Sequence, residues 1–179
     1  MFYTKYLYNQ NWNIGFTGDT VDSFFKFQAL SKVKWMKHSY RDRSFADPFI
    51  LKTTDEAIVL LAEEYIFNER KGRILKLVVN KVTKQLLERI VILELDTHLS
   101  YPAIFRKGDS IYMYPENLAS GKINIYRYED ETSKVTFVKT LIKEPLADPT
   151  IIDYKDKFWL VATKAPDTQE NACKGFCHG

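Results

Sequence analysis

The sequence predicts an all-β protein, specifically a partial, truncated β-propeller with about two and a half four-stranded blades. Three observations predict it. Aromatic residues, which favour strands, make up 15% of the 179 residues. A six-residue motif around a proline occurs three times. Short apolar segments separated by turn residues follow each copy, as expected for successive antiparallel strands.

The repeated motif reads small residue, Asp or Tyr, Pro, any residue, Ile, apolar residue. Its prolines, Pro48, Pro102 and Pro149, are 54 and 47 residues apart. A proline is tolerated as the first residue of a strand, because that residue need not donate to the ladder. Each motif is therefore expected to begin the innermost strand of one unit. The three copies are residues 46–51, 100–105 and 147–152.

A turn and an apolar strand follow each copy of the motif. The first two copies then continue with a further strand pair, so that a complete unit has about four strands in roughly 50 residues, the size of a propeller blade. The segment 122–128 alternates with period two, as a half-buried antiparallel strand requires. The predicted strands are 57–65, 73–79 and 86–95 in copy one, 111–114, 122–128 and 135–142 in copy two, and 158–162 in copy three.

A β-sandwich also contains strands at intervals of about 8–12 residues. It does not require a motif that returns about every 50 residues, so we favour the propeller. The predicted organisation is N-terminal strands within 1–42 (3–8 and 12–16), blades over 43–97 and 98–144, the start of a third at 145–164, and an irregular tail over 165–179. Because a propeller has about 4–8 blades, we expect a truncated ring whose exposed sheet edges an oligomer could cover.

Composition excludes several classes of partner. The net charge is +3 and the 26 basic residues are spread along the chain, so we expect no nucleic-acid partner. The sequence has no run of about 20 apolar residues that would span a membrane and no signal-peptide core, which predicts a cytoplasmic protein. Cys173, Cys177 and His178 offer three ligands at the wrong spacing for a zinc site. We expect no metal and no cofactor, since nucleotide-binding loops are absent as well.

Several motifs together resemble a known family. They resemble the N-terminal module of glucosamine inositolphosphorylceramide transferases, whose bacterial homologues are commonly described as glycosyl-hydrolase-like. The resemblance covers about residues 35–164 and implies a five-bladed propeller related to arabinanase and xylosidase type glycoside hydrolases, with a glycan or glycoconjugate as partner. The motifs that carry it are residues 43–49, 98–102, 113–117, 120–121 and 146–149.

The resemblance also implies roles for two aspartates in the motif. Asp47 resembles the general base of the hydrolase relatives, and Asp148 their auxiliary aspartate, which tunes the acid and orients the sugar. Glycoside hydrolysis needs two carboxyl groups across the scissile bond, so a pair that faces one space is a suitable arrangement. The alternative is that each aspartate only caps a turn before its proline.

Five further residues complete the predicted site. Glu116 ends the second strand of copy two and is our third catalytic candidate, although it could instead be a loop residue. Glu64 lies near the equivalent place in copy one and Thr163 in copy three, and this variation argues against a purely structural position. His98 could hydrogen-bond a sugar hydroxyl or a carboxylate. Arg43 could pair with Asp47 and hold it ionised. Tyr101 takes the aspartate position in copy two. We assign Arg43, Glu64, His98 and Tyr101 to substrate binding, whereas Trp35 and Trp159 are expected in the core.

Three functions are compatible with this pattern. The first is a glycoside-hydrolase-like propeller that acts on or binds a glycan and is inactive in this truncated chain. The second is a non-catalytic accessory or sugar-binding module of a glycosyltransferase. The third is an interaction propeller with no sugar ligand. A pair of carboxylates near a sugar-sized space separates the first two functions from the third.

Overall fold

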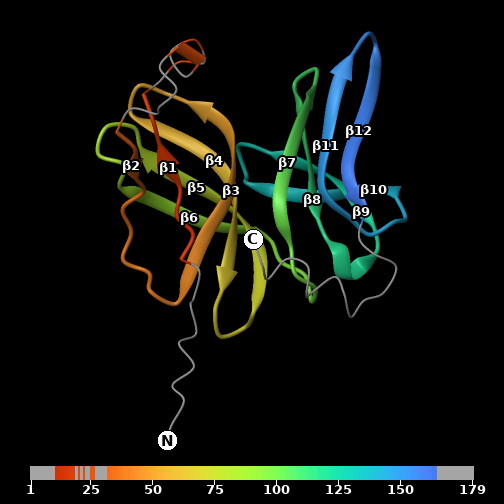
Figure 1. The fold of residues 1–179 in the computed structure, drawn as a ribbon, viewed down its shortest axis with the longest axis horizontal. Helices are drawn as coiled ribbons and strands as arrows, with labels where there is room; N and C mark the ends of the chain where they lie inside the picture. The colour runs from red at the N-terminus through yellow and green to blue at the C-terminus, as the bar shows by residue number, and fades with distance from the viewer. Residues whose placement is uncertain (1–10, 19, 21, 23–24, 27–31, 165–179) are drawn as a thin grey trace, which may run out of the picture.

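The protein is all-β in its computed structural model, which describes residues 11–18, 20, 22, 25–26 and 32–164. The strands form two four-stranded antiparallel sheets and two strand pairs (Figure 1). Sheet one contains β3 (Arg43–Thr53), β4 (Ala57–Ile66), β5 (Lys71–Asn80) and β6 (Leu86–Leu93), and sheet two contains β7 (Ser100–Lys107), β8 (Ser110–Glu116), β9 (Ile123–Glu129) and β10 (Lys134–Ile142). The pairs are β1 (Gly15–Phe16) with β2 (Lys34–Trp35), and β11 (Leu146–Tyr154) with β12 (Lys157–Lys164).

The strands of each sheet follow one another in sequence order, because short turns connect them. The β3–β4 turn is closed by the Thr54 hydroxyl, which accepts a hydrogen bond from the Ala57 N–H at 3.0 Å. At the β5–β6 turn the Asn80 side chain accepts the N–H of Thr83 at 2.8 Å. The β7–β8 turn contains Gly108 at φ 55°, a conformation that glycine adopts without steric cost. Local turn chemistry of this kind yields sequential antiparallel sheets.

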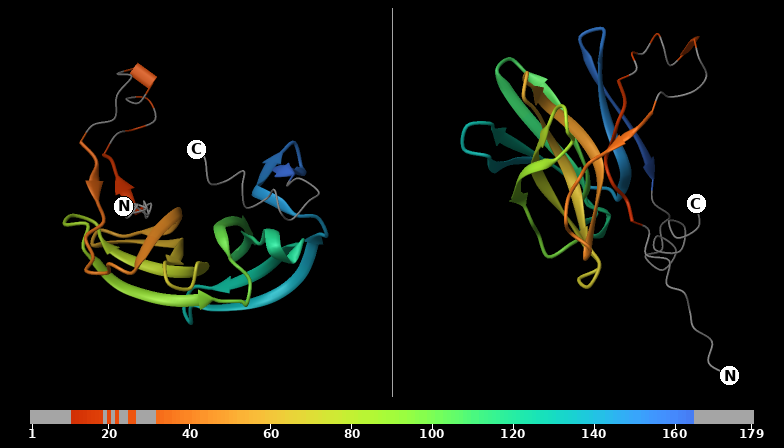
Figure 2. Two further views of the ribbon diagram at one scale, coloured as in Figure 1. Left: turned by 60° about the horizontal axis from the view of Figure 1, so that its bottom comes forward. Right: turned by 90° about the vertical axis from the view of Figure 1, so that its left-hand side faces the viewer.

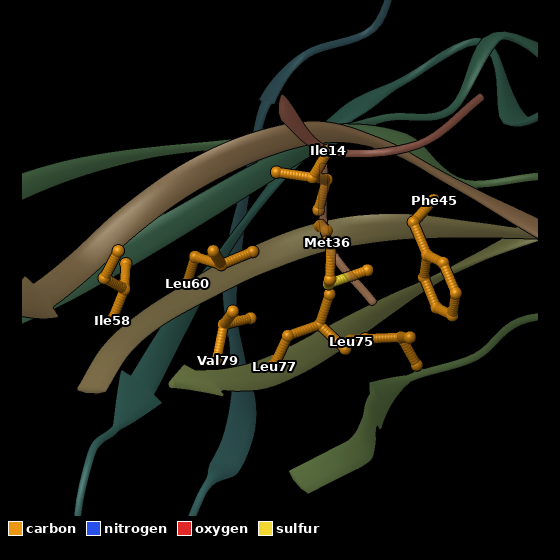
Figure 3. Packing of buried hydrophobic residues seen from close by; sticks show 9 residues of the cluster. Ile14, Met36, Phe45, Ile58, Leu60, Leu75, Leu77 and Val79 are labelled. Atoms are coloured by element: carbon orange, nitrogen blue, oxygen red, sulfur yellow. The ribbon is translucent and has the colours of Figure 1, made fainter. Parts of the chain in front are cut away.

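Sheet one is buried on both faces. Leu60 and Leu77 point to one face, where they pack with Ile14 and Met36 from the β1–β2 segment (Figure 3). Leu61 points to the opposite face, toward sheet two. Because side chains alternate along a strand, the run of apolar residues in β4 covers both faces, as is typical of a strand that lies between two layers.

Sheet two is likewise packed on both faces. Met113 on β8 faces sheet one, and its neighbour Tyr114 faces the β11–β12 pair, where it packs with Leu146. The layers therefore stack in the order β1–β2, sheet one, sheet two, β11–β12. They follow one another along an arc, and both end pairs rise on the same side of it (Figure 2). The first strands of the successive units also contact each other, β3 with β7 and β7 with β11.

The structure confirms the all-β class and corrects several details. Trp35 and Trp159 are not in the core: their exposed fractions are 59% and 55%, because they lie on the outer faces of the two end pairs. The expected strand 12–16 is reduced to Gly15–Phe16. Each motif proline lies inside its strand and not at the start, beside a break in the ladder. The expected strand 3–8 and the tail 165–179 lie outside the described residues.

Candidate functional site

The repeated motif forms the same irregular backbone in all three units. The residue before each motif proline has a positive φ, 51° at Asp47, 44° at Tyr101 and 48° at Asp148. Non-glycine residues rarely adopt this conformation, and a following proline disfavours helical backbone angles further. At each site the register of the first strand shifts against the second, as in a β-bulge, which redirects side chains and tolerates proline.

Two carboxylates bind the backbone at the bulge of the next unit. Asp47 Oδ2 accepts the N–H of Tyr101 at 3.1 Å, and Glu116 Oε2 accepts the N–H of Asp148 at 2.8 Å. A bulge removes an N–H from the ladder, so a partner from outside the sheet is needed to satisfy it. The acidic side chains of one unit therefore lie against the first strand of the next.

Glu63 on β4 is the site residue that sequence reasoning missed. The ladder pairs Glu63 with Ala46, as it pairs Glu116 with Ser100 and Thr163 with Ala147. Glu63, and not Glu64, is therefore the counterpart of Glu116. A shift of one residue along a strand moves a side chain to the other face of the sheet. The register shifts at the bulges differ between the units, so counting along the sequence alone does not reach this position.

Glu63 is an unusual carboxyl group, because it is buried beside other acids. Burial, then the charge of Asp47 and a hydrogen bond with Asp47, together with the charge of Glu116, raise the pKa of Glu63 to about 8. At neutral pH Glu63 is therefore largely protonated, and its O–H is available to donate to the Asp47 carboxylate.

Glu64 lies on the opposite face, within a cluster of arginines. It is fully buried, and its carboxylate pairs with Arg43 at 3.1 Å, with Arg73 at 2.8 Å and with Arg89. Burial opposes ionisation, but the hydrogen bonds from these arginines lower the pKa of Glu64 overall. Glu64 is thus a buried structural anion and does not lie on the face of sheet one that carries Glu63.

Arg43 does not make the predicted pair with Asp47. Its guanidinium binds Glu64 on one side and the exposed carboxylate of Asp42 on the other, at 2.5 Å, and it lies over the ring of Tyr40. The hydrogen bond from Arg43 holds the pKa of Asp42 at about 2. On a regular strand Arg43 and Asp47, four residues apart, would point to the same face, but the bulge after Ala46 interrupts this alternation and separates them.

His98 is held beside Glu63. Its Nδ1 accepts the N–H of Gly72 at 2.8 Å, so its proton is on Nε2, which lies 3.6 Å from Glu63 Oε1. Burial lowers the pKa of His98, and the charge of Asp47 opposes this only in part. The close packing needs a glycine at position 72, because a Cβ there would lie 2.4 Å from the Leu99 carbonyl oxygen and 2.6 Å from Glu63 Oε1.

Glu116 is surrounded by both motif aspartates. Burial raises the pKa of Glu116; hydrogen bonds from the Asp148 N–H and the Ser100 side chain lower it, while the charges of Asp148 and Asp47 raise it. The two aspartates thus act on one carboxyl group. We call Asp47, Glu63, Glu116 and Asp148 the acidic cluster. Asp148 is exposed and Asp47 is half-buried, so the cluster is reachable from solvent.

Tyr101 provides the aromatic and hydroxyl part of the site. Its ring packs edge to face with Phe49 at 5.1 Å between centroids, and its OH lies 3.1 Å from Thr150 Oγ1. Tyr101 therefore joins the first strands of all three units.

In the described part of the chain, no group of three or more His, Cys, Asp or Glu side chains is arranged to hold a metal ion. Nor do the described residues include a helix long and apolar enough to cross a membrane.

Comparison with known proteins places the chain in a family. Residues 28–174 match the family described as glucosamine inositolphosphorylceramide transferase 1, N-terminal. The glucosamine inositolphosphorylceramide transferase 1 of Arabidopsis thaliana is 35% identical over 66 residues, and those of Oryza sativa subsp. indica and subsp. japonica are 36% identical over 66 residues. The match covers 37% of this chain and 9% of each relative. No solved structure matches the chain significantly. The chain belongs to the family of glucosamine inositolphosphorylceramide transferase 1 N-terminal domains.

Proposed function

We propose that the chain is a non-catalytic accessory module of the glycosyltransferase type, which binds a glycan or glycoconjugate at the acidic cluster. Family membership supports the link to a glycosyltransferase, since the relatives are named glucosamine inositolphosphorylceramide transferases. The observation that carries the proposal is the meeting of Asp47 and Asp148, from two different units, around Glu116. Like charges repel, so bringing acidic side chains from separate units together does not favour folding. Their convergence therefore supports a role in recognition.

The proposed architecture is part of a propeller. Sheets one and two would be complete blades, and β11–β12 the inner half of a third. Contacts between the first strands, β3 with β7 and β7 with β11, support this arrangement, as does the face-to-face stacking along an arc. In a propeller the innermost strands of the blades meet around a shared axis. The acidic cluster would then lie near this axis, where the inner ends of the blades meet.

The chemistry of the cluster suits sugar hydroxyl groups. The exposed Asp148 and the half-buried Asp47 present carboxylate oxygens, which accept hydrogen bonds. Tyr101, with its hydroxyl group, offers an aromatic surface that is only partly buried. Aromatic rings beside polar groups that converge from several strands are typical of small-ligand sites.

A glycan microarray tests the proposal with a conservative variant. Asp47→Asn keeps an oxygen that can accept the Tyr101 N–H, and asparagine tolerates the positive φ of this position. The fold should therefore persist while the charge is lost. We expect the wild-type chain to bind a subset of glycans and Asp47→Asn and Asp148→Asn to lose at least about tenfold in affinity, as for one charged hydrogen bond. Asp109→Asn, in the β7–β8 turn, is the matched control, and equal binding by all four proteins would contradict the proposal.

A second candidate is glycoside hydrolysis, and one observation favours it. Glu63 has a pKa raised to about 8 beside the Asp47 carboxyl, so a protonated acid lies next to a second carboxyl group. Glycosidases use one carboxyl group as acid and a second as base or nucleophile, at least about 5 Å apart across the scissile bond, so Glu63 and Asp47 would have to separate when a glycan binds. Release of nitrophenol from aryl arabinosides and xylosides, lost in Asp47→Asn and in Glu63→Gln, would support hydrolysis. Binding without turnover would leave the accessory module as the function.

A further inference from the structure

The β11–β12 pair has one uncovered apolar face. Ile151 and Leu160 point inward and pack against sheet two. The outward residues Ile152 and Trp159 lie directly opposite each other in the ladder, with exposed fractions of 46% and 55%. Tyr154 and Val161 extend the same face, each more than half exposed. We call these four residues the outer patch. A contiguous apolar patch of this kind marks an interaction surface in a soluble protein.

The opposite end of the stack also carries an exposed tryptophan. Trp35 on β2 points outward, and Met36, directly after β2, is buried against sheet one. Trp35 lies opposite Gly15, and a Cβ on Gly15 would be 3.1 Å from its ring, so the ring rests over the glycine. Beside it is an open hollow of about 410 Å³, lined among others by Val33, Trp35, Val82 and the lysines Lys32, Lys34 and Lys37.

Among the described residues, the end layers differ from the middle layers in their number of strands. The two middle layers have four strands each, and the two end layers have two each. β12 corresponds to β4 and β8, which both pair with a further strand; in the described part of the chain β12 has β11 alone. An open strand edge beside an apolar face favours pairing with another chain.

We propose that two copies of the chain associate head to tail, with the outer patch of each copy against the β1–β2 end of the other. Both ends rise on the same side of the arc, so two arcs that face each other bring each end of one copy to the opposite end of the other (Figure 2). A head-to-tail contact of this kind closes into a ring when the rotation allows it. The inference concerns assembly and does not depend on the glycan ligand.

The alternative arrangement pairs two β12 edges with each other and would leave Trp35 at the other end uncovered. The hollow beside Trp35 offers a space for a protruding aromatic side chain, which is a common feature of interface anchors.

Sedimentation equilibrium tests the proposal. At about 50 μM, a concentration high enough to populate a moderate dimer, we expect twice the chain mass of 21.0 kDa. The double variant Trp159→Thr, Val161→Thr and the single variant Trp35→Thr should each weaken the dimer by at least about tenfold, and threonine keeps the strand preference. Leu87→Thr, at an exposed position on β6, is the matched control and should remain dimeric. Circular dichroism checks that each variant keeps its strands.

Mixing the two dissociated variants distinguishes a head-to-tail contact from a contact between identical ends of the two copies. In a head-to-tail ring, the mixture of the Trp35 variant and the Trp159/Val161 variant retains one intact interface and should regain part of the dimer. A dimer that is unaffected by Trp35→Thr, or a mixture that stays monomeric, would overturn the head-to-tail contact. A wild-type chain that stays monomeric would overturn the proposal and leave strands from another protein as the occupant. Glycan binding by the monomeric variants would show separately that the acidic cluster functions.

Discussion

Glu116 on β8 accepts a hydrogen bond from the backbone N–H of Asp148 on β11, with 2.8 Å between Oε2 and N. The same relation joins Asp47 to the Tyr101 N–H one unit earlier, at 3.1 Å. Acidic side chains thus connect each unit to the bulge of the next. The acids that we assign to recognition also hold the first strand of the next unit, so positioning and binding are combined in one group of residues.

Removal of the Glu116 carboxyl group should loosen the β11–β12 pair. Glu116→Ala leaves the Asp148 N–H without its acceptor, which costs about 1–2 kcal/mol. Glu116→Gln keeps an acceptor oxygen and serves as the control. Amide hydrogen exchange is the measurement: the Asp148 amide should exchange at least about fivefold faster in the alanine variant. Equal exchange rates in the two variants would contradict a role of Glu116 in holding this strand.

The raised pKa of Glu63 predicts a pH-dependent stability. In the unfolded chain Glu63 loses its proton near pH 4.5, and in the folded chain near pH 8. The folded state therefore binds more protons between these values, and stability falls as the pH rises from about 4.5 to 8. Glu63→Gln stays neutral and should equal the wild type at pH 5 but exceed it by about 2–4 kcal/mol at pH 9.

Urea denaturation of both proteins at the two pH values measures this difference. Glu88→Gln, at a half-exposed position on β6, is the control, and its stability relative to the wild type should not change with pH in this way. A difference between Glu63→Gln and the wild type that is the same at pH 5 and pH 9 would show that Glu63 titrates normally.

The arginine cluster around Glu64 predicts a large loss of stability. Glu64→Gln leaves Arg43, Arg73 and Arg89 without their shared buried anion, and loss of one partner of a buried ion pair costs about 3–5 kcal/mol. Glu94→Gln removes a partly exposed partner of Arg73 and should cost less than about 1 kcal/mol. Thermal unfolding followed by circular dichroism compares the two. Similar losses would mean that Glu64 is solvated in the folded protein.

The close packing at Gly72 predicts a severe effect of a single methyl group. In Gly72→Ala the new Cβ would meet the Leu99 carbonyl, Glu63 and His98, each within 2.7 Å. Overpacking of this kind costs about 1–3 kcal/mol or more. Gly18→Ala has nothing within 4 Å and should be neutral. The midpoint of urea unfolding is the readout, and a wild-type midpoint for Gly72→Ala would contradict the described contacts.

The repeat in the sequence predicted much of the fold, because each unit repeats a local pattern of turn and alternation. It placed Asp47, Tyr101 and Asp148 at equivalent positions, and the structure gives all three a positive φ. The bulges themselves could not be predicted from the pattern, because they arise from tertiary pairing. For that reason Glu64 was chosen in place of Glu63, one residue away and on the other face. Trp35 and Trp159 were expected in the core, since hydrophobicity alone does not distinguish a buried face from an uncovered one.

A nitrogen–proton correlation NMR titration tests the central claim most directly. Three backbone amides report on the site, because Tyr101, Asp148 and Gly72 donate their N–H groups to Asp47, Glu116 and His98. On titration with glucosamine, glucuronate, xylose and myo-inositol, we expect saturable shifts of these amides for at least one ligand, and the loss of these shifts in Asp47→Asn. Unchanged amides at all three positions with every ligand would contradict a glycan site at the acidic cluster.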